Sequence, residues 1–150
     1  MDRIVNAEAA YIEYGNDCII IDIGTAATFC VVTGDSFAGG LIGPGIELTK
    51  RALAENTSNL PEIDFEKPDR LVARDTVNAI KSGFYYGWLM LVEGIIGLIE
   101  EEYKRTFRVI CTGGYSKILS ENIRHENIFD PLLTMKGIKR IYKQNIKNGQ

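Results

Sequence analysis

The stretch that decides the fold is residues 18–44, which read CIIIDIGTAATFCVVTGDSFAGGLIGP. Its opening apolar run is typical of a strand that is covered on both faces of a sheet. Gly34 and Asp35 form a hairpin-turn signal between the two apolar segments that follow. We therefore expect three consecutive strands, at Cys18–Ile23, Ala27–Thr33 and Ser36–Ile42.

Helical and strand patterns extend outward from this three-strand meander, and a polar segment from Thr57 to Arg74 reads as a surface loop. We expect helices at Asp2–Tyr14, Ile46 to about Asn56, Val77 to about Lys104, a short one through Ser120, and Thr134 to about Asn145, with strands at Phe107–Cys111 and Ile128–Phe129. Three antiparallel strands followed by alternating helices and strands are the pattern of one α/β domain of the actin-like, ribonuclease H-like type (ASKHA superfamily). We expect residues 1–150 to form that single domain.

The overall composition excludes several classes of function. A net charge of -3 argues against a surface for nucleic acid or for an anionic membrane, because both need a basic patch. The three cysteines, Cys18, Cys30 and Cys111, lie in apolar stretches and are expected to be buried, reduced thiols in a reducing, cytoplasmic compartment. The apolar run from Phe84 to Ile99 is interrupted by Glu93 and by glycines, so we expect a buried helix and not a membrane span.

The sharpest chemical motif follows the first strand, where Asp22 is succeeded by Gly24 and Thr25. A glycine there lets the backbone approach a phosphate closely, and the threonine amide and hydroxyl can donate to its oxygens. Asp22 can hold a cation beside the phosphates. The alternative is a plain hairpin whose turn is rich in Asp and Gly.

Two segments that open helices could also contact a ligand. Asp2 could act as a general base and Arg3 as an anion-binding group at a helix N-terminus, or Asp2 could be only an N-cap. Either Asp75 or Thr76 could cap the long helix, and the Thr76 hydroxyl could also meet a substrate.

Two glycine turns could let the backbone lie close to a ligand. The turn that contains Pro44 and Gly45 could lay backbone against a small polar substrate, or be a turn with a helix start. Gly113 and Gly114 could let backbone pass along an adenosine, although Gly-Gly at a strand-to-helix turn is common.

The long predicted helix carries glycines at Gly83, Gly87, Gly94 and Gly97. A stripe of small residues allows close helix packing, either inside the chain or at a subunit interface, and the neighbouring aromatic residues favour the interface. The run Glu100 to Glu102 is expected to be a solvated helix face, and His125 a residue at the surface or at a sheet edge.

Taken together, these motifs resemble the type III pantothenate kinases in order and spacing across essentially the whole chain. The matching segments are Asp2-Arg3-Ile4-Val5-Asn6-Ala7, Asp22-Ile23-Gly24-Thr25, Gly43-Pro44-Gly45-Ile46, Asp75-Thr76-Val77, Ser82-Gly83-Phe84-Tyr85-Tyr86-Gly87 and Thr112-Gly113-Gly114. The family is cytosolic and dimeric, uses ATP with Mg²⁺, and performs the first step of coenzyme A synthesis.

The resemblance also implies roles for individual residues. Asp2 would accept the proton of the pantothenate hydroxyl, and Arg3, Gly45 and Thr76 would contact pantothenate. Asp22 would bind a monovalent cation, K⁺ or NH₄⁺. ATP would be bound at Gly24, Thr25, Gly113 and Gly114. A dimer-type interface would run through the helix that carries Gly83, Gly87 and Gly94.

The sequence also departs from the family pattern. The N-terminal domain with an Asp-x-Gly-Asn-Thr phosphate loop is not among these residues. Met1 stands where the family's Gly-Ala-Asp-Arg segment has alanine. Ala27 stands where threonine is usual, which predicts the loss of one phosphate-side hydroxyl. We therefore expect one subunit of a split, heteromeric pantothenate kinase, active when a second chain supplies that domain. The alternatives are a non-catalytic regulatory module related to transcriptional accessory factors, and the C-terminal domain of a longer kinase chain.

Overall fold

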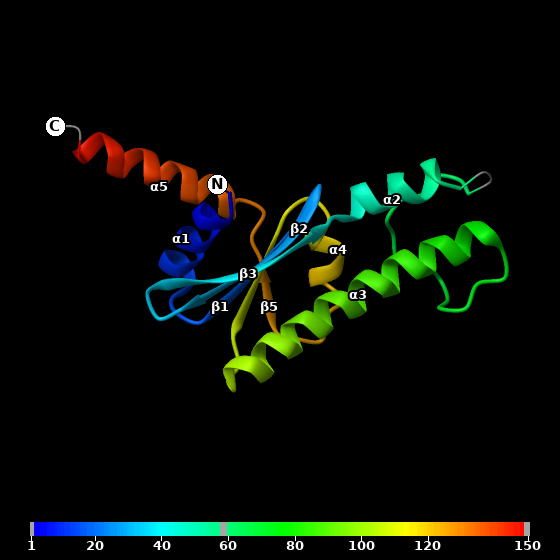
Figure 1. Ribbon diagram of the computed structural model, residues 1–150, viewed down its shortest axis with the longest axis horizontal. Helices are drawn as coiled ribbons and strands as arrows, with labels where there is room; N and C mark the ends of the chain where they lie inside the picture. The colour runs from blue at the N-terminus through cyan, green and yellow to red at the C-terminus, as the bar shows by residue number, and fades with distance from the viewer. Residues whose placement is uncertain (1, 58–59, 149–150) are drawn as a thin grey trace.

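The computed structural model describes residues 2–57 and 60–148, which form a mixed β-sheet with helices on both faces (Figure 1). Its elements are α1 (Asp2–Tyr14), β1 (Cys18–Ile23), β2 (Ala26–Thr33), β3 (Ser36–Pro44), α2 (Ile46–Glu55), α3 (Thr76–Tyr103), β4 (Arg108–Thr112), α4 (Ser116–Ser120), β5 (Asn127–Phe129) and α5 (Leu133–Asn148). Each expected helix and strand is present. The described part of the segment between α2 and α3 contains no helix or strand, as expected for a loop. That segment is not wholly a surface loop, however, because Ile63 is buried.

The strand order is β3-β2-β1-β4-β5. β2 pairs antiparallel with both β1 and β3, whereas β1–β4 and β4–β5 are parallel pairs. The carboxyl ends of β1, β3, β4 and β5 therefore lie along one edge of the sheet, where open α/β sheets bind their ligands.

Side-chain alternation along β1 and β2 builds a separate core on each face of the sheet. On one face α3 and α4 cover a cluster that includes Ile19, Ile21, Ile23, Phe29, Val31, Tyr85, Val92, Ile96 and Leu119. On the other face α1 and α5 cover Cys18, Ile20, Cys30, Val32, Ala10 and Leu133. All three cysteines are buried free thiols, as predicted.

Helix α3 packs on the sheet through one side only. By length and composition it could cross a membrane, since its most apolar window has a mean hydropathy of 1.4, but core helices can pass the same test. Its buried residues, which include Trp88, Leu89 and Ile99, join the core of the sheet. The sequence prediction of a buried helix is therefore confirmed for that side of α3.

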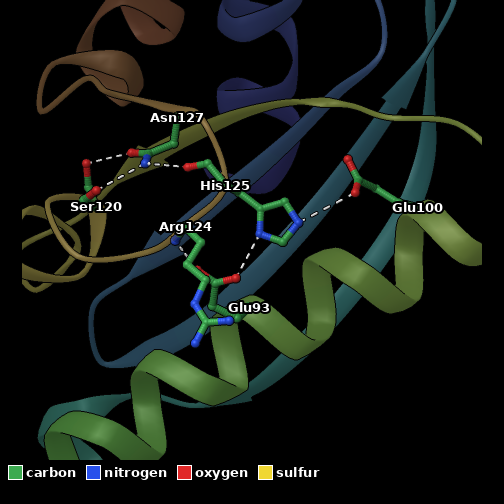
Figure 2. A network of polar contacts seen from close by, with 6 residues as sticks. All are labelled: Glu93, Glu100, Ser120, Arg124, His125 and Asn127. Atoms are coloured by element: carbon green, nitrogen blue, oxygen red, sulfur yellow. Dashed lines mark hydrogen bonds and ion pairs between the residues drawn. The ribbon is translucent and has the colours of Figure 1, made fainter.

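A polar network fastens the segment between α4 and β5 to α3 (Figure 2). His125 Nδ1 lies 2.9 Å from Glu93 Oε2, and His125 Nε2 lies 3.5 Å from Glu100 Oε2. Glu100 also accepts a 2.9 Å hydrogen bond from the Phe107 amide. The prediction that Glu100 belongs to a solvated face was therefore wrong, because this carboxylate joins the end of α3 to its neighbours; Glu101 and Glu102 are exposed, as expected.

The start of α5 is fixed by Asp130, a buried residue just after β5. Its carboxylate accepts hydrogen bonds from Tyr14 Oη and Lys136 Nζ, both at 2.7 Å, and from the Leu132 amide at 3.0 Å. Burial would raise the pKa of Asp130, but the hydrogen bonds from Lys136 and Tyr14 outweigh it and lower that pKa. Asp130 thus ties α5 to the end of α1.

Candidate active site

Three turns meet at the edge formed by the strand ends. The Gly45 amide, after β3, donates a 2.8 Å hydrogen bond to the Thr25 carbonyl in the β1–β2 turn. The Tyr115 amide, after β4, donates a 3.2 Å hydrogen bond to the Ile23 carbonyl. The structure therefore joins the three segments that the sequence predicted as ligand turns.

Two of the glycines in these turns are required by close backbone contacts. A Cβ at Gly45 would lie 2.1 Å from the Gly24 carbonyl oxygen. Gly113 has a φ of +95°, and a Cβ there would lie 2.5 Å from Asp22 Oδ1. By contrast, a Cβ at Gly24 or Gly114 would meet nothing within 4 Å, so these two positions leave the backbone open to a ligand.

Asp22 lies at the centre of this edge and is held from the α1 side. Its Oδ2 accepts a 3.0 Å hydrogen bond from Asn6 Nδ2, and Asn6 Oδ1 in turn accepts a 2.7 Å hydrogen bond from Thr134 Oγ1. Sequence reasoning singled out neither Asn6 nor Thr134. A polar residue at a buried position of an amphipathic helix was the available signal for Asn6, which is only 2% exposed.

A second polar group borders the edge at the start of α2. The Tyr115 hydroxyl donates to the Glu47 carboxylate, and Lys50 Nζ lies 3.6 Å from Glu47 Oε2. The hydrogen bond from Tyr115 is the main cause of a lowered pKa at Glu47, and the charge of Lys50 lowers that pKa further. The same hydrogen bond raises the pKa of Tyr115 to about 12. Lys50 is buried, with 8% of its side chain exposed, and places a positive charge beside the Glu47 carboxylate. Sequence reasoning did not single out Lys50, because Glu and Lys three residues apart are an ordinary helix surface pair.

The other predicted site residues are placed differently. Arg3 lies on the Asp22 side of the sheet, but its Nε donates to Cys30 Sγ at 3.4 Å and its guanidinium stacks 5.4 Å from the centre of the Phe37 ring. Thr76 opens α3, which begins beyond α2 and away from the sheet edge (Figure 1), and the N-cap is Asp75. Asp2 begins α1, but its side chain and Met1 lie outside the described residues.

The register of the β1–β2 hairpin corrects one prediction. Ala27 pairs with Ile23 and is buried on the α3 face, whereas Asp22 pairs with Thr28 on the opposite face. Threonine at position 27 would therefore point away from Asp22, so alanine there removes no hydroxyl from the Asp22 side. Thr28 is the residue whose side chain shares the face of Asp22.

The oxygen atoms described at this edge are the Asp22 carboxylate and the backbone carbonyls of the turns. In the described ranges, no group of three or more His, Cys, Asp or Glu side chains is placed to hold a metal. One carboxylate among backbone carbonyls fits K⁺ or NH₄⁺. Mg²⁺ usually binds through one or two carboxylates together with substrate phosphates and water.

An apolar groove of about 650 Å³ lies on the opposite face, between β2, β3, α2 and α3. Its walls include Leu41, Ile42, Gly83, Gly87 and Leu91. A Cβ added at any of the four glycines of α3 would meet nothing within 4 Å. These glycines therefore do not serve close packing among the described residues, and the internal alternative from the sequence analysis loses its basis.

Comparisons with known proteins agree with this arrangement. A family model for type III pantothenate kinases matches residues 1–97. Proteins of that name from Dehalococcoides mccartyi and Koribacter versatilis are 43% identical over 145 residues and 40% identical over 148 residues. These matches cover 96% and 98% of this chain, but 56% and 54% of the relatives, so the chain spans about half the length of the curated relatives it matches.

Solved structures confirm the predicted fold class. A Campylobacter jejuni protein assigned to the Baf family of transcriptional activators aligns with a TM-score of 0.65 and 25% identity, covering 97% of this chain and 64% of its own. EutJ from Carboxydothermus hydrogenoformans aligns at 0.55 with 18% identity, covering 91% and 52%. MreB 5 of Spiroplasma citri aligns at 0.51 with 14% identity, covering 99% and 61%. The chain thus has an α/β fold of the actin-like ATPase type.

Proposed function

Because the chain belongs to the type III pantothenate kinase family, we propose that it takes part in the ATP-dependent phosphorylation of pantothenate to 4'-phosphopantothenate, a step of coenzyme A synthesis in the cytoplasm. The observation that carries the proposal is the meeting of the Asp22–Thr25 turn with Gly45 and Gly113 at one edge of an actin-like sheet. Phosphoryl transfer depends mostly on positioning and on neutralising charge, and an edge of this kind can supply part of both.

Each turn has its own role in the proposal. Thr25 contacts the phosphates of ATP beside the open backbone of Gly24. Gly113 fixes the turn after β4, and Gly114 leaves its backbone accessible to the adenosine. Asp22 holds a monovalent cation, which neutralises negative charge beside the phosphates, and Mg²⁺ accompanies the ATP phosphates.

The acceptor side of the reaction rests on the family resemblance. Asp2 accepts the proton from the pantothenate hydroxyl, and Arg3, Gly45 and Thr76 contact pantothenate. The start of α1, which carries Asp2 and Arg3, lies one turn from Asn6 and hence near Asp22. For Arg3 to reach a substrate at the edge, its guanidinium must leave Cys30 and the Phe37 ring.

A second domain completes the nucleotide cleft in this proposal, with residues 1–150 acting as the C-terminal domain. The prediction that a separate chain supplies that domain is part of the proposal, and the alternative is a domain of the same polypeptide. Native mass spectrometry of the protein from its own cells distinguishes the two. A separate subunit adds the mass of a chain different from this one, whereas a domain of the same polypeptide makes the single chain itself heavier than these 150 residues.

A second copy of the chain is the proposed occupant of the apolar groove. The glycines Gly83 and Gly87 line it and Gly94 is exposed further along α3, while Leu41 and Leu91 are exposed apolar side chains beside it. Burying such side chains favours association, and glycine lets two helices approach closely. Sedimentation of the chain should therefore detect a dimer that a Gly87→Glu variant weakens.

The kinase proposal is tested by mixing the folded chain with the domain that carries the phosphate loop and measuring phosphopantothenate formation. Asp22→Asn should lower kcat by about 100-fold, the scale of losing one electrostatic contact in a phosphoryl-transfer site. Asp35→Asn, at the exposed turn between β2 and β3, is the matched control and should leave the rate unchanged. An unchanged rate with Asp22→Asn, or no product when both components are folded, contradicts the proposal.

The similarity to the Baf family protein favours one other candidate, a non-catalytic regulatory module. Replacing Asp2 separates the candidates in cells. If the chain acts as a kinase, Asp2→Asn should abolish its support of coenzyme A synthesis, whereas a regulatory module should tolerate the change.

A further inference from the structure

Asn6 has a buried side-chain amide whose nitrogen and oxygen form hydrogen bonds to two different elements. Its side chain is 2% exposed, its Nδ2 donates to Asp22 in β1, and its Oδ1 accepts from Thr134 in the first turn of α5. A carboxylate can only accept hydrogen bonds, so the NH₂ end of Asn6 has to face Asp22. The Thr134 hydroxyl then satisfies the oxygen end.

The position of Thr134 is itself fixed by close packing between α1 and α5. A Cβ at Gly137 would lie 2.5 Å from the Val5 carbonyl oxygen, so α5 approaches the α1 backbone one residue before Asn6. Asp130 holds the preceding turn through the Leu132 amide. Thr134 lies between the Leu132 and Gly137 contacts, which hold the backbone on both sides of it. The Thr134 hydroxyl is therefore fixed in position, and rotation of the Asn6 amide would break their hydrogen bond.

We propose that Asn6 and Thr134 are positioning residues that fix the orientation of the Asp22 carboxylate for the ligand bound at the strand edge. With Oδ2 held by Asn6, Oδ1 faces the Gly113 turn, where a Cβ would lie 2.5 Å away. The Asn6 hydrogen bond narrows the rotation of the ionised carboxylate, and ordering the carboxylate before the ligand arrives favours cation binding. This inference rests on the proposed function, because it takes Asp22 to be the cation ligand.

The test uses the whole chain, with potassium ion as the probe. Potassium chloride is titrated against choline chloride at constant ionic strength, and the amide NMR signals of Gly24, Thr25 and Gly113 report binding. Thr134→Val removes the hydroxyl at nearly constant shape and should weaken potassium binding by about threefold to tenfold, the factor that a buried neutral hydrogen bond contributes. Thr134→Ser keeps a hydroxyl and should bind potassium like the original chain.

Equal potassium affinity in Thr134→Val and the original chain would overturn the positioning role and leave the kinase proposal intact. If the original chain shows no potassium response, Asp22 is not a cation ligand, and both proposals lose this site. Amide signals away from the edge show whether each variant is folded. If Thr134→Val does not fold, Thr134→Ala removes the same hydroxyl with less bulk and is judged by the same comparison.

Discussion

Gly113 and Gly114 are adjacent glycines for which the structure predicts opposite responses to alanine. Gly113 has a φ of +95°, and an added Cβ would lie 2.5 Å from Asp22 Oδ1 and 2.7 Å from the Ile23 backbone nitrogen. The left-handed backbone costs an L-residue about 1–2 kcal/mol, and overpacking against a fixed backbone costs about 1–3 kcal/mol. Gly113→Ala should therefore lower the free energy of unfolding by about 2–5 kcal/mol.

Gly114→Ala is the matched control, because its Cβ would meet nothing within 4 Å and its φ is not in the left-handed region. Its effect should lie within about 1 kcal/mol, with a gain possible from reduced freedom of the unfolded chain. Urea unfolding followed by circular dichroism gives both values. The reasoning is refuted if the two variants lose similar stability, or if Gly113→Ala changes the free energy of unfolding by less than about 0.5 kcal/mol.

Three further predictions concern buried polar groups and thiols. Because the pKa of Asp130 is lowered in the folded chain, the ionised carboxylate stabilises the fold above its ordinary pKa, and this contribution is lost as the pH falls through the lower folded value. Asp130→Asn should therefore make the free energy of unfolding fall less steeply with pH. Urea unfolding repeated from neutral pH to about pH 2 measures this difference. The Tyr85 hydroxyl is buried without a hydrogen-bond partner among the described residues, so Tyr85→Phe should leave stability unchanged or raise it by about 1 kcal/mol in the same assay, and a clear loss would reveal a partner. Burial raises the pKa of Cys111 to about 12 and that of Cys18 to about 11. At about pH 8 a thiol reagent should therefore label both cysteines only as fast as the chain unfolds, and peptide mass mapping identifies the labelled residues. Rapid labelling of the folded chain would contradict their burial.

Much of the fold could be predicted because its signals are local. Three local signals each specify an element within a few residues of sequence: the apolar run Cys18–Ile23, the turn at Gly34 and Asp35, and the helical pattern from Val77 onward. The order of these elements then limits the topology. The prediction for Glu100 was wrong because its surroundings depend on His125, which the segment between α4 and β5 brings to the C-terminal part of α3.

The candidate site could be predicted only in part, for a related reason. Asp22, Thr25 and Gly113 belong to short motifs that stand out in the sequence. Asn6 lies in a matching segment, but there it is only one polar residue of a helix, and Thr134 lies in no motif. The role of both residues depends on a hydrogen bond that spans 128 positions of the chain. The orientation of Ala27 is likewise set by the pairing register of β1 and β2, which a residue list does not reveal.

The proposed cation site and the proposed self-association surface lie on opposite faces of the sheet. Asp22 and its support from α1 and α5 lie on one face, whereas Ala27 and the apolar groove beside α3 lie on the other. Adjacent strand residues point to opposite faces, so β1 and β2 serve both sides at once. A second copy seated on the groove would therefore not occupy the α1 and α5 face that supports Asp22. Changes at Gly87 should weaken self-association without altering potassium binding, and changes at Thr134 should do the reverse.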